Sequence, residues 1–146
     1  MLPPAHAAIS GVISIAVWYY FKSAECAVIS FIAGVFIDLD HLIDFYTNHR
    51  FTLKVKRIYC VCARMRLKRL YLGLHSYEIV ILLWAAIYIF ALSNYWKALA
   101  IGVTQHIISD QIANPLNNLG YFFTYRILKG FKRERLINEL KEPSRG

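Results

Sequence analysis

Four long apolar stretches constrain this chain more than any other feature of its sequence. They cover residues 5–21, 26–37, 79–92 and 98–112 of the 146. Each is shorter than the roughly 20 apolar residues of a simple membrane-spanning helix, but neighbouring apolar or aromatic residues can extend each at its ends. We therefore predict an all-α chain with four membrane spans, at about residues 5–21, 24–43, 76–93 and 96–113.

A soluble bundle with buried core helices is the alternative explanation of these stretches. Hydrophobic residues make up 58% of the chain and aromatic residues 15%, which leaves little polar surface for a soluble fold with four such helices. The composition also excludes a disordered chain, and three cysteines are too few, and odd in number, for a disulfide-built scaffold. We therefore expect an integral-membrane four-helix bundle, with residues 1–125 as one membrane-embedded helical domain and residues 126–146 as a basic tail.

The positive charges predict how such a bundle would lie in the membrane. Fifteen of the 17 Lys and Arg residues fall in a basic insertion at residues 47–72 or in the tail at residues 126–146. Only Lys22 and Lys97 lie in the other two links. Basic residues accumulate on the cytoplasmic side of membrane proteins. We therefore predict a multi-pass protein of the inner (cytoplasmic) cell membrane, with both termini, the insertion and the tail in the cytoplasm.

The insertion and the tail also contain apolar residues among their basic ones. In the insertion, Val55, Ile58 and Cys62 recur at helical spacing, and Ile127 and Leu128 form an apolar patch in the tail. Such segments are typical of basic amphipathic helices that lie on anionic membrane lipids in the cytoplasm. Nucleic-acid binding is the competing explanation of the net charge of +8, but the positive-inside distribution already accounts for this excess.

The histidines and acids of the predicted spans gather at one end of the bundle. With the topology above, they lie at the cytoplasmic ends of the spans, and the opposite leaflet receives essentially none. Ionised carboxylates near hydrocarbon are costly unless they are paired or bind a metal, so such groups are candidates for function. The set comprises His6, Asp38, Asp40, His41, Asp44, His75, Glu78, His106 and Asp110.

The spacings within this set favour a metal centre. His106 and Asp110 lie one turn apart on one helix face, and His75 and Glu78 have the i,i+3 spacing of metal sites in helical bundles. Imidazoles and carboxylates without thiolates suit a divalent metal, first Zn and otherwise Mn or Fe, and the number of acids allows one to three ions. A buried salt-bridge network is the alternative, but these acids and histidines come without equivalent buried Lys or Arg.

Four motifs resemble those of a bacterial and archaeal family of small integral-membrane proteins described as membrane-bound metal-dependent hydrolases. That family has an early helix-borne His, a Pro-Asp-x-Asp-His segment, a Thr-His-Ser segment and a Gly-x-x-x-His-x-x-x-Asp helix. It is distantly similar to zinc-dependent phospholipase C, an all-helical phosphodiesterase. The corresponding segments occur here in the same order, as Ala5-His6, Asp38-Leu39-Asp40-His41, Gly73-Leu74-His75-Ser76 and Gly102-x-x-x-His106-x-x-x-Asp110.

The chain departs from the family pattern at three points. Ile37 stands in the place of the family's Pro, Leu74 replaces its Thr, and the basic insertion separates His49-Arg50 from the segment that carries His75. The resemblance covers roughly residues 5–115. It implies that the metal ligands are His6, Asp38, Asp40, His41, His75, His106 and Asp110.

The resemblance and the lipid-binding segments together predict a metal-dependent hydrolase of phosphoesters, with a lipid headgroup as one candidate substrate. A metal-activated water would attack the ester, and Asp44 and Glu78 are the candidate general bases. Arg50 is a candidate phosphate contact. Two other functions fit the same residues: a metal or proton transporter or sensor, which needs polar residues continuing across the spans, and a non-catalytic structural membrane protein.

Overall fold

The computed structural model describes residues 3–48, 58, 61 and 67–137, and this part of the chain has an all-helical fold. Its strand-like contacts are two isolated antiparallel bridges, Arg69 with Lys132 and Leu116 with Ile137. The predicted all-α class is therefore confirmed. The helices, in chain order, are α1 (Pro3–Phe21), α2 (Ala24–Phe36), the 3-10 helix η1 (Ile37–Leu39), α3 (Asp40–Asn48), α5 (Tyr77–Ile89), α6 (Asn94–Ala113), the 3-10 helix η2 (Asn118–Tyr121), α7 (Phe123–Leu128) and α8 (Arg133–Leu136).

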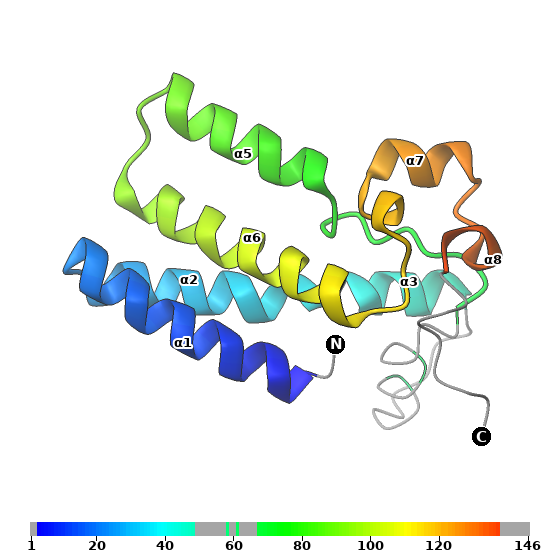
Figure 1. Cartoon of the computed structure of the whole chain (residues 1–146), viewed down its shortest axis with the longest axis horizontal. Coiled ribbons are helices and arrows are strands. Elements are labelled where there is room, and N and C mark those ends of the chain that lie inside the picture. The colour runs from blue at the N-terminus through cyan, green and yellow to red at the C-terminus, as the bar shows by residue number, and fades with distance from the viewer. Residues whose placement is uncertain (1–2, 49–57, 59–60, 62–66, 138–146) are drawn as a thin grey trace.

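The centre of the fold consists of α1, α2 and α6. Helix α2 packs along both α1 and α6, which also contact each other, and α5 packs on α6 (Figure 1). The α1–α2 and α5–α6 links lie at one end of the molecule, whereas α3, α7 and α8 lie at the other (Figure 1). Two serines support this arrangement, because Ser23 caps the start of α2 and Ser76 caps the start of α5.

Two glycines allow the central helices to approach closely. A Cβ atom on Gly34 of α2 would overlap the side chains of Gln105 and Ser10, and one on Gly102 of α6 would overlap the carbonyl of Ser30. Small residues at helix crossings let backbones approach, which is how helices associate where water supplies no hydrophobic driving force. The close α2–α6 contact brings the end of α2 beside the polar half of α6.

Two helical segments are long and apolar enough to cross a membrane. They are Pro4–Phe21 and Ala24–Asn48, the second formed by α2, η1 and α3 in continuity. Only 22% and 28% of the respective windows are buried within the molecule. Helix α5 is apolar but shorter. Membrane association is thus supported for two of the four predicted spans.

The described part of the predicted tail is packed against the helical domain. The predicted boundary at residue 125 falls inside α7, and Arg126 and Leu136 are fully buried. Leu136 belongs to a core with Leu67, Leu70 and Phe45, which joins the C-terminal segment to α3 and to the chain before α5. Most of the basic insertion, including His49 and Arg50, and residues 138–146 of the tail lie outside the described residues.

Candidate metal centre

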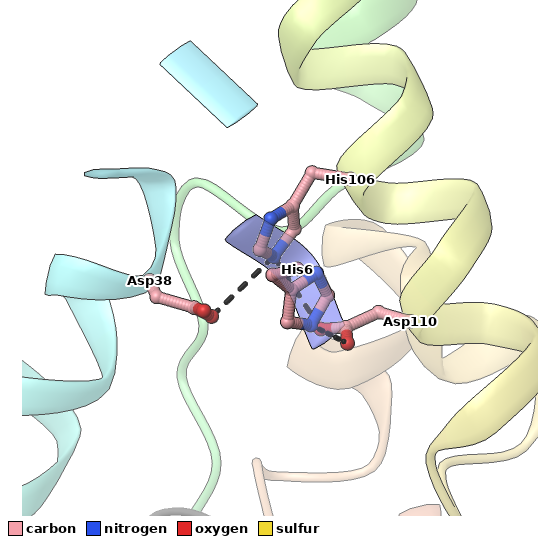
Figure 2. Close-up of side chains that lie close together, drawn as sticks. All are labelled: His6, Asp38, His106 and Asp110. Atoms are coloured by element: carbon pink, nitrogen blue, oxygen red, sulfur yellow. Dashed lines mark hydrogen bonds and ion pairs between the residues drawn. The ribbon is translucent and has the colours of Figure 1, made fainter. Parts of the chain in front are cut away.

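Histidines and aspartates from five parts of the chain converge at the end of the bundle that carries α3. His6 lies near the start of α1, Asp38 in η1, and His106 and Asp110 on α6, and these four side chains point toward one another (Figure 2). His41 on α3 and His75 in the segment before α5 complete the cluster. The helix switches from α to 3-10 geometry at η1, the short turn that carries Asp38.

Asp38 is a carboxylate that three of the histidines approach. Its Oδ1 atom lies 3.4 Å from Nε2 of His41, 3.4 Å from Nε2 of His75 and 3.3 Å from Nε2 of His106. Its side chain is 27% exposed, whereas those of His75 and Asp110 are 1% and 2% exposed. The cluster therefore reaches solvent on the side of Asp38.

Asp110 provides the second shared carboxylate. Its Oδ2 atom lies 3.6 Å from Nε2 of His75 and 3.7 Å from Nε2 of His106, and its Oδ1 atom lies 2.9 Å from Nε2 of His6. The two Nε2 atoms of His75 and His106 are themselves 3.1 Å apart. His6 stacks on His106, with ring centroids 4.0 Å apart.

Two overlapping groups of these residues could hold a metal ion. One consists of His6, Asp38, His106 and Asp110, and the other of Asp38, His41, His75 and Asp110, each with its ligand atoms within 4.8 Å of one another. Ligands about 2.0–2.1 Å from a tetrahedral zinc ion lie about 3.3–3.4 Å apart, close to several distances of the cluster. The donor set thus fits a divalent metal, and Asp38 and Asp110 belong to both groups.

The second nitrogen of two histidines is held by a partner outside these groups. Nδ1 of His75 lies 3.0 Å from the carboxylate of Asp40, and Nδ1 of His106 donates to the carbonyl of Gly34 over 2.6 Å. In metal sites such a contact fixes the ring and presents the other nitrogen to the ion. Asp40, also expected as a ligand, belongs to neither of these groups, and its contact here is with Nδ1 of His75.

The charge state of His75 follows from this packing. Burial by itself favours the neutral imidazole, but hydrogen bonds to Asp38 and Asp40 outweigh it and raise the pKa of His75 to about 10. Without a metal, His75 is therefore protonated at neutral pH. A cation that binds Nε2 of His75 must displace this proton.

The two candidate general bases, Asp44 and Glu78, have other contacts. Asp44 accepts hydrogen bonds from the backbone N–H groups of Tyr71 and Leu72 at 2.9 Å and 3.1 Å. Glu78 accepts from the N–H groups of Phe123 and Thr124 at 2.9 Å and 3.0 Å. Neither belongs to the two metal-binding groups. Their carboxylates hold chain segments beside the centre, and no contact in the described structure supports a base role for them.

Arg126 is a buried residue beside the centre, and the charge pattern of the sequence does not distinguish it from the other basic residues of the tail. Its guanidinium donates to the carbonyls of Leu72 and His75 at 2.7 Å and 3.0 Å. One feature of the sequence could have indicated its burial: Arg126 is the one charged residue in the apolar and aromatic run at residues 121–128. The positive-inside rule, however, accounts for every basic residue of the tail equally, so it did not set Arg126 apart.

Comparisons of this chain with protein-family models, with curated proteins and with solved structures gave no match.

Proposed function

We propose that this chain is a membrane-bound metal-dependent hydrolase of phosphoesters. The observation that carries the proposal is the convergence of four histidines on two shared carboxylates, Asp38 and Asp110, at the end of the bundle where most of the described basic surface residues lie. A divalent metal there supplies Lewis acidity toward a phosphoryl oxygen and acidifies water. The motif order shared with the hydrolase family supports the same chemistry.

The residues of the chain have separate tasks in this proposal. His6 and His106 with the two shared aspartates would hold one cation, and His41 and His75 with the same aspartates are the residues that would hold a second. Asp40 and the carbonyl of Gly34 orient His75 and His106. The partly exposed Asp38 marks the side from which a phosphoester approaches.

The exposed apolar surface of the bundle supports the membrane location in this proposal. Large apolar residues are exposed along α1, α2 and α5, for example Ile15, Ile32 and Leu82 at 66%, 47% and 68%. An exposed apolar surface of this extent fits lipid contact better than water. We propose α5 and α6 as the third and fourth spans, with the metal centre, the tail and both termini on the cytoplasmic side.

Transport is less well supported than hydrolysis. Buried Ser10, Ser14 and Ser30 continue the polar interior from His6 along the α1–α2–α6 interface. Beyond them, Val17, Cys26 and Ala98 form a buried apolar cluster toward the opposite end of the bundle. A passage for ions would need polar groups at that end as well.

The decisive experiment measures metal content and hydrolysis in the same preparations. The full chain is purified in detergent, loaded with Zn²⁺, Mn²⁺ or Fe²⁺, and assayed by elemental analysis. Hydrolysis is measured on bis(p-nitrophenyl) phosphate and on phospholipid vesicles, which separate a soluble phosphoester from a lipid headgroup. We expect up to two ions per chain, and loss of metal and activity in Asp38→Asn.

Glu25→Gln is the matched control, because Glu25 is an acid at the start of α2, at the opposite end of the bundle. It should keep the metal content and the activity of the wild type. Absence of tightly bound metal from the wild-type chain would contradict the metal centre, and metal uptake into proteoliposomes without hydrolysis would favour the transporter.

A further inference from the structure

The segment that carries His75 has no regular secondary structure to hold it. Residues 70–76 lie outside every helix and strand, yet Leu70, Leu72, His75 and Ser76 are buried. A buried segment of this kind needs partners for its backbone N–H and C=O groups. Those partners decide where the imidazole of His75 lies.

The N–H groups of this segment are paired mainly from α3. Asp44 accepts from Tyr71 and Leu72, and Asp40 accepts from Leu74 over 2.9 Å. Leu70 donates to the carbonyl of Phe131 in the C-terminal segment over 2.9 Å. His75 itself donates to the carbonyl of Leu72 over 3.1 Å. The donors are thus held by two side chains of one helix and by two backbone contacts.

Two carbonyl groups of the segment are paired by α7. Arg126 donates through Nη1 to the carbonyl of Leu72 and through Nη2 to that of His75 itself. The planar guanidinium fixes the spacing of the two carbonyls, which a lysine ammonium cannot do from one position. Arg126 is 0% exposed, and burial lowers its pKa. A buried cation is costly unless it is hydrogen-bonded, as this guanidinium is to both carbonyls.

Helix α7 is in turn fixed to the start of α5. Glu78 accepts hydrogen bonds from the N–H groups of Phe123 and Thr124 and from the hydroxyl of Thr124. Glu78 therefore caps the N-terminus of α7, and Arg126 of α7 contacts the segment just before α5. Helix α7 is thus bonded to the chain on both sides of Tyr77: through Glu78 in α5 and through the carbonyls of Leu72 and His75.

We propose that Arg126 is a positioning residue for the metal centre and that it acts by fixing the backbone of His75. The C-terminal segment, through α7, then sets the affinity and geometry of the group that contains His75. This inference rests on the proposed metal centre and goes beyond it, because it assigns a site function to a residue whose hydrogen bonds go to backbone carbonyls of the segment.

The test compares Arg126→Met with Arg126→Lys in the full chain in detergent. The cobalt(II) absorption spectrum reports ligand geometry, and competition with a chelator reports affinity. We expect Arg126→Met to bind cobalt about 10–100-fold more weakly, with an altered spectrum, as is usual when a group that orients a metal-bound histidine is lost. Arg126→Lys should fall between Arg126→Met and the wild type.

Arg135→Met is the matched control, because Arg135 is an exposed arginine of the same segment. It should keep the wild-type spectrum and affinity. A wild-type spectrum and affinity in Arg126→Met would overturn the inference. Loss of folding is separated from loss of positioning by Arg126→Ala with added guanidinium, which should restore the spectrum in a correctly folded chain.

A readout without metal distinguishes this inference from the proposed function. Hydrogen exchange of residues 70–76 in the metal-free chain should become faster in Arg126→Met, while exchange in α2 and α6 stays unchanged. If the wild-type chain binds no metal, the proposed function fails, and this exchange experiment still decides whether Arg126 fixes the segment. Unchanged exchange in residues 70–76 would overturn the positioning role.

Discussion

At the scale of single residues, the cluster separates groups that face the centre from groups that orient them. Asp38 and Asp110 are shared by both possible metal-binding groups, whereas Asp40 contacts the far side of His75. The sequence motif predicts the same role, metal ligand, for both Asp38 and Asp40. Only their contacts assign them different tasks, since neighbouring positions on a helical turn point in different directions.

This difference predicts unequal effects of two alanine substitutions. Asp38→Ala removes a ligand from both groups and should abolish tight metal binding. Asp40→Ala removes only the partner of His75 Nδ1 and of the Leu74 N–H, and should weaken metal binding about 10–100-fold. Chelator competition on both purified variants measures this. Equal loss in the two variants would mean that Asp40 is itself a ligand.

The protonation of His75 predicts the pH dependence of metal binding. Its pKa is raised to about 10 in the metal-free protein, so the metal competes with a proton at every lower pH. Affinity should therefore rise with pH, by about tenfold per pH unit for one displaced proton, and level off near pH 10. Titrations in buffers of different ionisation enthalpy measure the proton released. The same affinity at pH 6.5 and pH 8.5 would contradict this assignment.

At the scale of elements, the α2–α6 crossing connects packing to the metal centre. Asp38 lies in η1, the turn that follows α2, and His106 lies on α6, so their separation depends on how closely the two helices approach. Gly102 lies at that contact, with the Cβ of Ala33 and the backbone N of Gly34 within 3.1 Å of the position that its own Cβ would take.

Gly102→Ala should therefore destabilise the fold and weaken the metal centre together. We expect a loss of about 1–3 kcal/mol in unfolding free energy, because backbone and side chains must shift to admit the methyl group. Thermal unfolding in detergent and metal affinity measure the two effects. Gly11→Ala on α1 is the control, since its Cβ meets nothing within 4 Å and alanine favours a helix. A stabilised Gly102→Ala variant would contradict the close contact.

At the scale of the whole molecule, most of the described basic residues lie at the same end as the candidate metal-binding side chains. Helix α8, which contains Arg133 and Arg135, lies at the same end as α3 and the candidate metal centre, whereas the α1–α2 link with Lys22 and the start of α6 with Lys97 lie at the opposite end (Figure 1). The proposed topology places the first end in the cytoplasm.

Cysteine labelling tests this topology. In a chain in which Cys26, Cys60 and Cys62 are replaced by serine, single Lys97→Cys and Arg135→Cys variants are expressed in bacterial cells. A membrane-impermeant maleimide should label Lys97→Cys from outside the inner membrane and Arg135→Cys only after the membrane is opened. Labelling of both variants from the same side of the membrane would contradict the proposal that α6 crosses the membrane between the two positions.

The sequence by itself determined the helical class and the end of the bundle at which the histidines and acids meet. Apolar stretches fix helices locally, and residues at known positions along those helices fall at known ends. The tertiary structure alone decided which acids are shared and which only orient a histidine, and that Arg126 holds the segment of His75. These assignments depend on contacts between residues 31 to 104 positions apart, such as His75 with His106 and His6 with Asp110. No local pattern encodes such distances, because they arise from how the helices cross.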